Sequence, residues 1–584
     1  RDAKRRSFTR ATVFEPPYDE TGPPLEQRHD WDSWHLGSGD SRTLLYGRSE
    51  YGQNSECRFV GNILPGPAIT TITLTGSAAT PVAFFEALGR LFVCAGRRLF
   101  RIDPADDSVV ESRDAGATNV YRSGIAWEGV AVATTDETAG GSMRSLAALA
   151  TPDVWSAASA TPAWLLARET KRLYGVSRTG GLRNLASGLG IGSTSWTDPV
   201  QAGESTEQPE GLAAWNQSVF VGKPDGFFGF DADGEAVDIL PELKPQKHAS
   251  NGFNMAAWHS SILVPWRRGL FRNYHPRYEA AGLERLPLNR SPVRGRWWDF
   301  AGEGLWIYAP MQVGTHTYIK VGRDKAQGET GFGSIIWDDF LYLASTTCQA
   351  IHVSSLWDPP RLFFGHGNNV GYVKLSTDFG AADVWGSDWV FSTAAAGGTR
   401  YLPSVDLGSP GLNKYWRKVE IITEDCTNSN YWKIYGSVDG AARVQIGENI
   451  TANGRIERFF PVSTTGRRMQ VSVDWVNTSA TTPPKITGIA VFGAVVAQKI
   501  PVIRLLLDLR TGLRIGNTQI RNSAETQRMA LETLAESAPV PVQDVYGNSL
   551  TGRIRRLTIT ESEQEGMDDA AYTAEVLIQV MESS

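Results

Sequence analysis

Apolar and polar residues alternate over short stretches in the first two thirds of the chain, and these stretches recur in a fixed order. In one repeat, the alternating Val219 and Val221 predict one strand and Phe227–Phe230 the next. The sequence Lys223-Pro224-Asp225-Gly226 between them is typical of a hairpin turn. A third strand is expected near Val237–Ile239. Each repeat therefore predicts a meander of about four strands, which cannot bury both of its apolar faces alone and must stack on its neighbours.

The same order of strand, turn and strand occurs at two other places. Leu91–Val93 and Leu99–Ile102 flank one turn, and Ile262–Val264 and Leu270–Tyr274 flank another. Ahead of the first repeat, Ala68–Thr75 alternates as a strand. We expect this early strand to complete the last meander and so to close the series into a ring.

A tryptophan marks the same position in several repeats. Trp215, Trp258 and Trp337 are each followed by apolar residues four and six positions later. Spacings of 43 (215 to 258), 40 (258 to 298) and 39 (298 to 337) give a period near forty, which is typical of a β-propeller. Counting the repeats predicts about seven blades, with six or eight as the alternatives, and starts near Phe85, Trp127, Trp164, Trp215, Trp258, Trp298 and Trp337. We interpret the tryptophans as packing residues between blades; the alternative is a ring of exposed tryptophans that binds sugar.

The forty-residue period ends near Asp378, and a different pattern follows. Alternating strands are predicted within Lys414–Ile421, Tyr431–Gly440, Arg468–Val473 and Pro483–Phe492, with no helix among them. Strands at this spacing favour a β-sandwich of the jelly-roll type.

The last 85 or so residues predict a small α+β or β-barrel unit with one helix. Asn522-Ser523-Ala524-Glu525 is an N-terminal capping signal, and the helix-forming run TQRMALETLAES follows it. Strands are expected at Val502–Leu509, Val540–Val545, Gly552–Thr560 and Tyr572–Met581. The chain as a whole is thus predicted to be mainly β, with an N-terminal arm at 1–60, a propeller at 61–385, a sandwich at 386–497 and a C-terminal domain at 498–584.

Charge and composition narrow the choice of partner. A net charge of -6, from 57 basic and 63 acidic residues, argues against nucleic-acid binding. The longest strongly apolar stretch, Ile489–Ala497, is much shorter than the roughly 18 residues of a membrane-spanning helix. We therefore expect a soluble protein that neither binds nucleic acid nor inserts into a membrane.

Cysteine and histidine positions give no sign of a metal site. Cys57, Cys94, Cys348 and Cys426 lack paired spacing, so we expect four buried thiols. The eight histidines include no pair at the spacing of metal ligands. No metal and no cofactor is predicted.

The C-terminal strands resemble a known class of assembly protein. Pro539–Asn548, Gly552–Ile554 and Leu557–Glu561 are similar to the closing strands of tail proteins from tailed bacteriophages, in which a small barrel with one helix mediates ring assembly. The runs KYWRKVEI, YWKIYGSVDG and PPKITGIAVFG also resemble modules of tail-tip and fibre proteins. The resemblance covers roughly the last 170 residues and concerns architecture, because no single motif is diagnostic.

This resemblance implies a structural, non-enzymatic component of a virion tail tip or baseplate. It implies partners among other tail and baseplate proteins, reached through a C-terminal tail-assembly domain, and a homo-oligomeric, symmetric ring. It also implies attachment to a host-surface glycan or protein. We expect the aromatic and basic runs Arg294–Trp297 and Trp266–Arg268 to provide such contacts, unless they pack internally.

Two other functions remain as alternatives: a carbohydrate-active enzyme of the glycosidase or sialidase kind, and a stand-alone glycan-binding module. Ser376–Trp385 approaches the Asp-box of sialidases, but its tryptophan lies one residue late. Catalysis would need two suitably spaced carboxylates, or an arginine cluster with Tyr and Glu, at the propeller axis. Carboxylate candidates are Asp299, Glu303, Asp338 and Asp339, of which the last two are expected in a turn. We predict no enzyme, and therefore no catalytic, cofactor-binding or metal-binding residues.

Overall fold

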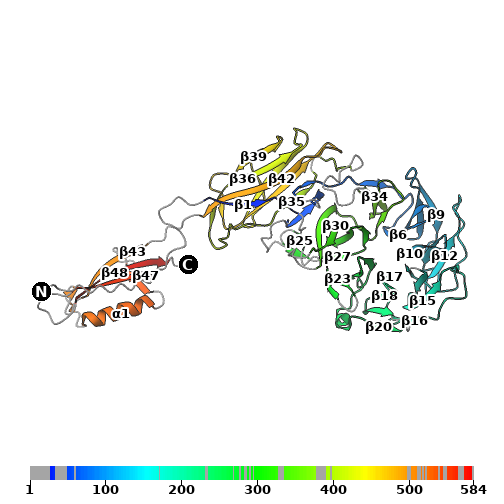
Figure 1. Cartoon of the computed structure of the whole chain (residues 1–584), viewed down its shortest axis with the longest axis horizontal. Helices are drawn as coiled ribbons and strands as arrows, with labels where there is room; N and C mark the ends of the chain where they lie inside the picture. The colour runs from blue at the N-terminus through cyan, green and yellow to red at the C-terminus, as the bar shows by residue number, and fades with distance from the viewer. Residues whose placement is uncertain are drawn as a thin grey trace. The chain divides into compact units, whose positions relative to one another are not determined.

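The chain folds into two compact units in the computed structural model. One comprises Glu26–Ala494, and the other includes the C-terminal residues from Val495. Residues described are 26–32, 34, 49–57, 61–169, 171–230, 235–267, 269–274, 278–281, 286–288, 291–293, 295–326, 334–375, 390–394, 397–495, 502–509, 514–515, 518–519, 523–536, 540–543, 549–562 and 571–581. Strands dominate both units, so the predicted mainly β fold is confirmed (Figure 1).

The large unit contains a series of antiparallel meanders, of which the described residues form seven sheets. The first sheet contains β6 (Pro81–Ala87), β7 (Arg90–Ala95), β8 (Arg98–Ile102) and β9 (Val109–Asp114). The second contains β10 (Tyr121–Trp127), β11 (Val130–Thr135) and β12 (Ser142–Leu146). The third contains β13 (Leu165–Glu169), β14 (Arg172–Val176), β15 (Gly181–Ala186) and β16 (Val200–Gln201). The fourth and fifth are β17 (Gly211–Trp215), β18 (Ser218–Lys223), β19 (Gly226–Phe230) and β20 (Ala236–Asp238), and β21 (Ala256–Trp258), β22 (Ser261–Trp266), β23 (Gly269–Asn273) and β24 (Tyr278–Ala280). The sixth has β27 (Arg296–Trp297), β28 (Ala301–Glu303), β29 (Trp306–Val313), β30 (His316–Asp324) and β31 (Ile335–Leu343), and the seventh β32 (Ile351–Ser354), β33 (Arg361–His366), β34 (Asn369–Lys374) and the early strand β5 (Thr70–Ile72).

A two-residue turn explains the recurring tryptophan. Trp215 ends β17, and Asn216 and Gln217 then turn the chain with φ of 51° and 63° before β18 begins. Positive φ at both central residues gives a turn whose twist matches that of the flanking strands. The same turn follows β6, β10 and β21, at Leu88-Gly89, Glu128-Gly129 and His259-Ser260. The recurring tryptophan therefore marks the end of the first strand of a sheet, just before the hairpin turn to the second strand.

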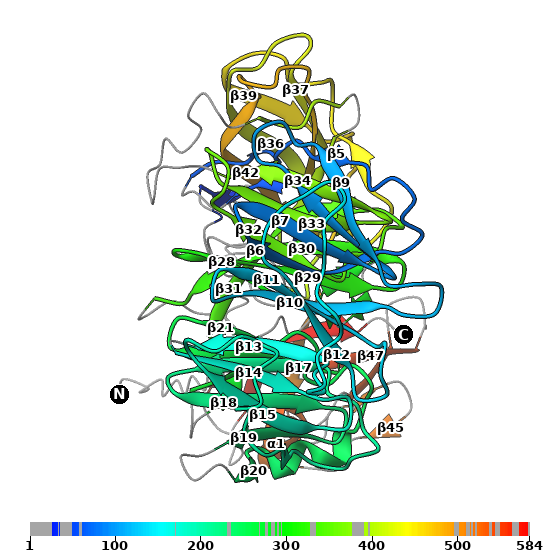
Figure 2. The ribbon, with the colours of Figure 1, turned by 90° about the vertical axis from the view of Figure 1, so that its right-hand side faces the viewer.

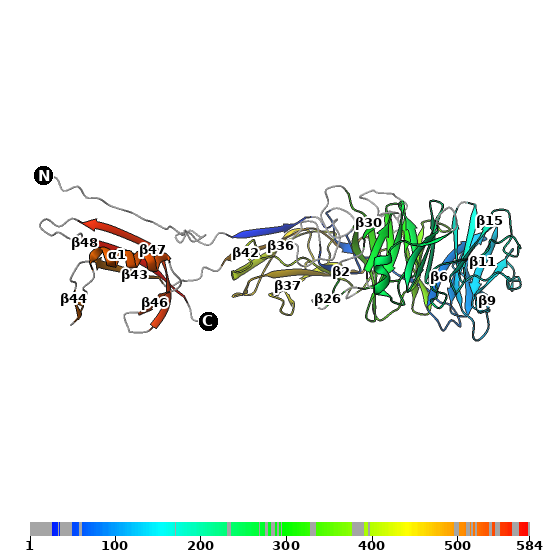
Figure 3. The same cartoon turned by 90° about the horizontal axis from the view of Figure 1, so that it is seen from below.

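Successive sheets touch one another, and the series returns to its start. Contacts join β6 with β10, β10 with β13, β13 with β17, β17 with β21, β23 with β27, β28 with β32, and β32 with β6. In Figure 1 these sheets, coloured from blue through cyan to green, surround a common centre, and Figure 3 shows them side by side from below. β5 pairs antiparallel with β34, Ile72 opposite Val370, which confirms the strand pairing predicted for Ala68–Thr75.

The tryptophans of the repeats are mostly buried, as the packing interpretation predicts. Trp127 is 1% exposed, Trp258 7% and Trp298 7%, whereas Trp215 is half-buried. Trp337 is also buried, but the prediction that it starts the seventh repeat is wrong. It lies in β31, the last strand of the sixth sheet, and the seventh sheet begins at Ile351. A tryptophan followed by apolar residues four and six positions later occurs in this last strand as well as in first strands. The pattern alone therefore does not distinguish a last strand from a first strand.

Two further five-stranded sheets complete the large unit, and Figure 2 shows their strands β36, β37, β39 and β42 at one end of it. One sheet contains β1 (Gln27–Trp31), β42 (Lys485–Val495), β36 (Lys414–Glu424), β39 (Gly454–Phe459) and β40 (Thr465–Gly466). The other contains β2 (Tyr51–Gln53), β35 (Thr399–Tyr401), β41 (Met469–Val476), β37 (Tyr431–Val438) and β38 (Val444–Gln445). Buried side chains of both sheets, among them Trp416, Trp432 and Trp475, form one core.

Part of the predicted N-terminal arm belongs to these two sheets. β1 pairs with β42 and β2 pairs with β35, so residues 27–31 and 51–53 are strands. The prediction of an arm at 1–60 is therefore wrong for these residues. Their partners lie more than 340 positions away, at Thr399–Tyr401 and Ile489–Gly493, and no local pattern indicates a pairing over that distance. Short ladders join β3 (Ser55–Glu56) to β4 (Leu64–Pro65) and β25 (Leu286–Leu288) to β26 (Ser291–Val293).

The C-terminal unit has one four-stranded antiparallel sheet, in the order β43 (Val502–Leu509), β48 (Ala571–Met581), β47 (Ser549–Ser562) and β46 (Val540–Gln543). A two-stranded ladder, β44 (Arg514–Ile515) with β45 (Thr518–Gln519), accompanies it. Helix α1 (Ala524–Glu536) contacts β43, β47 and β48. The Ser523 hydroxyl accepts a hydrogen bond from the N–H of Thr526 at 3.2 Å, so the predicted helix and its cap are both confirmed.

Besides α1, the described residues contain a single 3-10 helix, η1 (Pro241–Gln246), and none of their helices is long and apolar enough to cross a membrane. The four cysteines are buried free thiols, as predicted.

Candidate functional site

Two of the predicted carboxylates, Asp338 and Asp339, lie in β31 and not in a turn, so that prediction is wrong. Both are buried, at 6% and 2% exposure. Asp339 forms an ion pair with Lys320 of β30 and accepts a hydrogen bond from the Gly52 N–H at 2.9 Å. Arg400 of β35 donates to Asp338 at 2.5 Å. We call Lys320, Asp338, Asp339 and Arg400 the junction network.

The junction network joins the sixth sheet of the series to the sheet that contains β2 and β35. Burial raises the pKa of Asp338 to about 6, against the opposite effect of the Arg400 charge. Burial alone would lower the pKa of Arg400, but the carboxylate of Asp338 raises it overall. The pair is therefore charged at neutral pH. Because these charges are paired within the protein and closed off from solvent, we assign the network a structural role.

Asp299, the third predicted carboxylate, belongs to a second group of charges where several sheets meet. Arg122 of β10 donates from Nη2 to the backbone carbonyl of Glu210 at 2.9 Å, just ahead of β17. The same guanidinium lies 4.6 Å from the centroid of the Phe253 ring, ahead of β21. Arg296 of β27 lies 3.5 Å from the centroid of one Trp298 ring. These six residues form the central cluster: Arg122, Glu210, Phe253, Arg296, Trp298 and Asp299.

Aromatic contacts hold the two arginines of the central cluster. The rings of Phe253 and Trp298 meet edge to face, with centroids 5.0 Å apart. Arg296 also lies 5.3 Å from the Phe253 centroid, so both guanidinium groups share one ring. The Nε of Arg296 is buried without a hydrogen-bond partner among the described residues. A guanidinium held face-on against aromatic rings keeps its N–H edge available for an acceptor.

The carboxylates of the central cluster are perturbed by burial. Burial raises the pKa of Asp299 to about 7, although the N–H groups of Ile351 and Phe300 and the charge of Arg122 act to lower it. Burial also raises the pKa of Glu210, while Arg122 and Arg296 oppose that shift. Two arginines thus face two carboxylates, and burial raises the pKa of both carboxylates.

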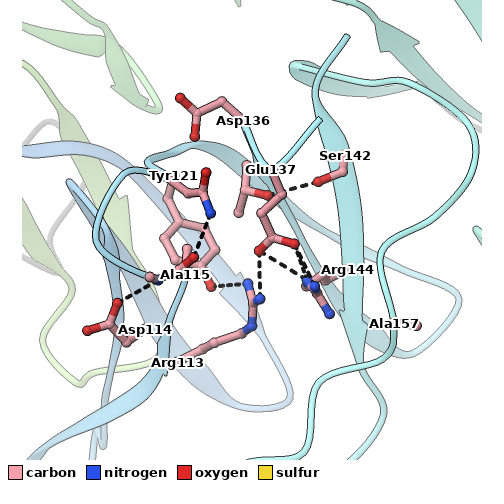
Figure 4. A network of polar contacts seen from close by, with 12 residues as sticks. Arg113, Asp114, Ala115, Tyr121, Asp136, Glu137, Ser142, Arg144 and Ala157 are labelled. Atoms are coloured by element: carbon pink, nitrogen blue, oxygen red, sulfur yellow. Dashed lines mark hydrogen bonds and ion pairs between the residues drawn. The ribbon is translucent and has the colours of Figure 1, made fainter. Parts of the chain in front are cut away.

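A charge network between two other sheets of the series differs from the central cluster in how its arginines are bonded. Glu137 accepts hydrogen bonds from Arg113 at 2.6 Å and from Arg144 at 2.5 Å, and Arg113 also donates to the Tyr121 hydroxyl at 2.7 Å. Figure 4 shows both guanidinium groups directed at the carboxylate of Glu137 between the first and second sheets. There both arginines bond directly to one carboxylate. In the central cluster, the described contacts of the arginines are to a carbonyl and to aromatic rings.

The remaining candidates from the sequence are placed as follows. Glu303 ends β28. Trp297 is 1% exposed and Trp266 5%, so these two residues of the expected contact runs pack internally. Arg268, Arg294 and the Asp-box-like run 376–385 lie outside the described residues.

Sequence reasoning singled out Asp299 and Arg296 but missed Arg122 and Glu210. Arg122 lies in β10 and Glu210 lies just ahead of β17, 88 positions away, so only the packing of the sheets brings them together. Within the described ranges, no group of three or more His, Cys, Asp and Glu side chains could hold a metal ion.

Titration of Asp299 should make the stability of the folded protein depend on pH. Its folded-state pKa of about 7 lies above the ordinary 3.8, so the folded protein holds this proton where the unfolded chain has lost it. The stability contributed by the protonated group is therefore present at low pH and lost as the pH rises from about 4 to 7. Asp299→Asn cannot titrate. We expect the free energy of unfolding of the wild type to fall relative to this variant over that interval, by at most about 4 kcal/mol.

The measurement is urea unfolding of both proteins at several pH values, followed by tryptophan fluorescence. Groups that face Asp299, namely Arg122 and Cys348, keep their charge states over this interval because burial raises the pKa of the Cys348 thiol and arginine stays protonated. A pH-independent difference between the two proteins would show that Asp299 is ionised throughout.

No known family profile matches the sequence, and no curated protein matches it. Solved structures that match part of this chain include the extracellular domain of a hybrid two-component system from B. thetaiotaomicron, at 13% identity and a TM-score of 0.40 over 57% of this chain and 46% of that one. A chain of the mitotic checkpoint complex matches at 11% identity and a TM-score of 0.38, over 55% of this chain and 94% of its own. The computationally designed protein Ika8 matches at 12% identity and a TM-score of 0.33, over 52% of this chain and 98% of its own. This chain thus spans 46% of the two-component domain, and likenesses this distant carry no argument about function.

Proposed function

We propose that this chain is a non-enzymatic structural component of a virion tail tip or baseplate. In this proposal the C-terminal unit docks onto neighbouring tail subunits in a symmetric ring, and the large unit projects outward to contact the host surface. The observation that carries the proposal is the division of the chain into a large all-β unit and a separate unit with its own sheet, helix and core. Such a division suits a chain that assembles through one part and binds through the other.

The large unit, in the proposal, is a seven-bladed β-propeller followed by a β-sandwich. Support for the propeller comes from the circuit of contacts between successive sheets, which returns from β32 to β6. The pairing of β5 with β34 joins the two ends of the series in one sheet. Support for the sandwich comes from the single core that its two sheets share.

The C-terminal unit offers features that suit lateral assembly. Strands β43 and β46 form the two edges of its sheet, and edge strands can pair with a neighbouring subunit. Apolar side chains are exposed here, with Leu506 of β43 at 69% and Met529 of α1 at 57%. An assembled neighbour would cover them.

Deletion of residues 498–584 is expected to abolish incorporation of the chain into particles, because it removes the docking unit. The measurement is immunoblotting of purified particles from cells that assemble the tail with either form. All 19 tryptophans lie between 31 and 475, so tryptophan fluorescence checks that the large unit of the truncated chain is folded.

A matched pair of substitutions refines this test. Leu506→Glu places a charge on the exposed edge strand and should reduce incorporation severalfold. Val462→Glu, at an 89% exposed site of the large unit, should leave it unchanged. Incorporation of a folded truncated chain at the wild-type level would exclude docking through the C-terminal unit.

A carbohydrate-active enzyme is the second candidate. The observation in its favour is the raised pKa of Asp299 beside Arg122, since hydrolases use carboxyl groups of raised pKa as general acids. Hydrolysis also needs a second carboxylate as nucleophile or base, and Glu210 is the residue of the central cluster that could serve. The release of reducing ends from a bound glycan would distinguish this activity from binding.

A further inference from the structure

We propose that the central cluster binds a sugar unit that carries one carboxylate group. This inference rests on the proposed attachment to a host surface and names the class of ligand that the large unit would recognise there. The carboxylate would accept hydrogen bonds from the guanidinium edge of Arg296, and sugar hydroxyls would donate to Glu210.

Geometry at Arg296 supports a planar acceptor. The guanidinium lies 3.5 Å from the Trp298 ring centroid and 5.3 Å from that of Phe253, and its buried Nε lacks a partner among the described residues. Stacking orients the group and reduces the entropy lost on binding. Because a carboxylate accepts two parallel N–H bonds from such an edge, it matches this arginine better than a hydroxyl does.

The charged side chains of the central cluster favour a ligand that carries a single negative charge. Arg122 lies against the same Phe253 ring as Arg296, which places the two guanidinium carbons within about 10 Å of each other. Glu210 interacts electrostatically with both arginines. A phosphate dianion would bring two charges towards this carboxylate, whereas a monocarboxylate brings one and its sugar hydroxyls can donate to Glu210.

Part of the cluster is exposed. Glu210, Arg296 and Asp299 each keep part of their surface exposed, while Arg122 behind them is 7% exposed. Four segments from four different sheets supply the residues, so the packed sheets fix their relative positions. This is the arrangement expected of a pre-organised binding site.

The test uses the full-length protein and three acidic monosaccharides, glucuronate, galacturonate and N-acetylneuraminate, with glucose as the neutral match. Ligand-observed NMR titration should give a dissociation constant in the millimolar range for at least one acid, and at least tenfold weaker binding of glucose. Arg296→Gln should weaken the acid at least tenfold, since it removes the charge and the paired donors. Arg417→Gln, at an arginine whose side chain is 55% exposed, should bind as the wild type does.

Three outcomes would overturn the proposal: no acid binds, glucose binds equally, or Arg296→Gln binds undiminished while tryptophan fluorescence shows it folded. Displacement of the acid by equimolar inorganic phosphate would also overturn it, in favour of a general anion site. Recovery of the sugar unchanged is expected, because binding and not turnover is proposed. Failure here leaves docking through the C-terminal unit standing, because the incorporation assay does not depend on a sugar.

Discussion

Lys320→Met is expected to lower the free energy of unfolding of the large unit by about 3–5 kcal/mol, the usual cost of removing one partner from a buried ion pair. The side chains of Lys320 and Asp339 are 0% and 1% exposed, so Asp339 would be left buried and without its ion-pair partner. Methionine preserves most of the volume of lysine, which limits the contribution of a cavity. Urea unfolding followed by tryptophan fluorescence measures the change, since every tryptophan lies in the large unit.

Two comparisons isolate the buried charge. Adding Asp339→Asn to Lys320→Met removes both charges and should recover most of the loss, with the Asn oxygen still available to the Gly52 N–H. Arg417→Gln breaks the exposed pair with Glu26 and should cost less than about 1 kcal/mol. A cost for Lys320→Met as small as that for Arg417→Gln would mean that solvent reaches the junction network.

Gly211→Ala should destabilise the large unit by about 1–3 kcal/mol through overpacking between the fourth and fifth sheets. A Cβ on Gly211 would lie 2.0 Å from the backbone oxygen of Gly252. That backbone cannot move aside easily, because the Gly252 N–H donates to the Pro265 carbonyl at 2.7 Å. Thermal and urea unfolding midpoints provide the measurement.

Gly192→Ala is the matched control, since a Cβ there meets nothing within 4 Å and its φ is not positive. We expect its stability to stay within about 0.5 kcal/mol of the wild type. Equal stability of the two alanine variants would contradict the close approach of β17 to the segment ahead of β21.

Local patterns in the sequence predicted individual strands well, because alternation and turn chemistry act over a few residues. The Val219 and Val221 alternation marks β18, and the capping serine marks the start of α1. The tryptophan pattern does not distinguish a first strand from a last one, which is why Trp337 was assigned to the wrong sheet. β1 and β2 were missed because their partners lie more than 340 positions away.

The candidate site shows the same limit. Asp299 and Arg296 drew attention because an acid and an aromatic–basic run are visible in the sequence. Arg122 lies in a strand that reads as ordinary, and its contact with the Glu210 carbonyl exists only once two sheets have packed. Burial, which sets the pKa of Asp299, is likewise a property of the packed sheets.

The early strands β1, β2 and β5 have a consequence for synthesis of the chain on the ribosome. Their partners are β42, β35 and β34, so these three strands find their places only after partner strands between residues 370 and 493 have emerged. Until then these strand edges are open to pairing with other chains. Folding of the large unit is therefore completed late, and a chaperone that shields the first strands should raise the yield of native protein.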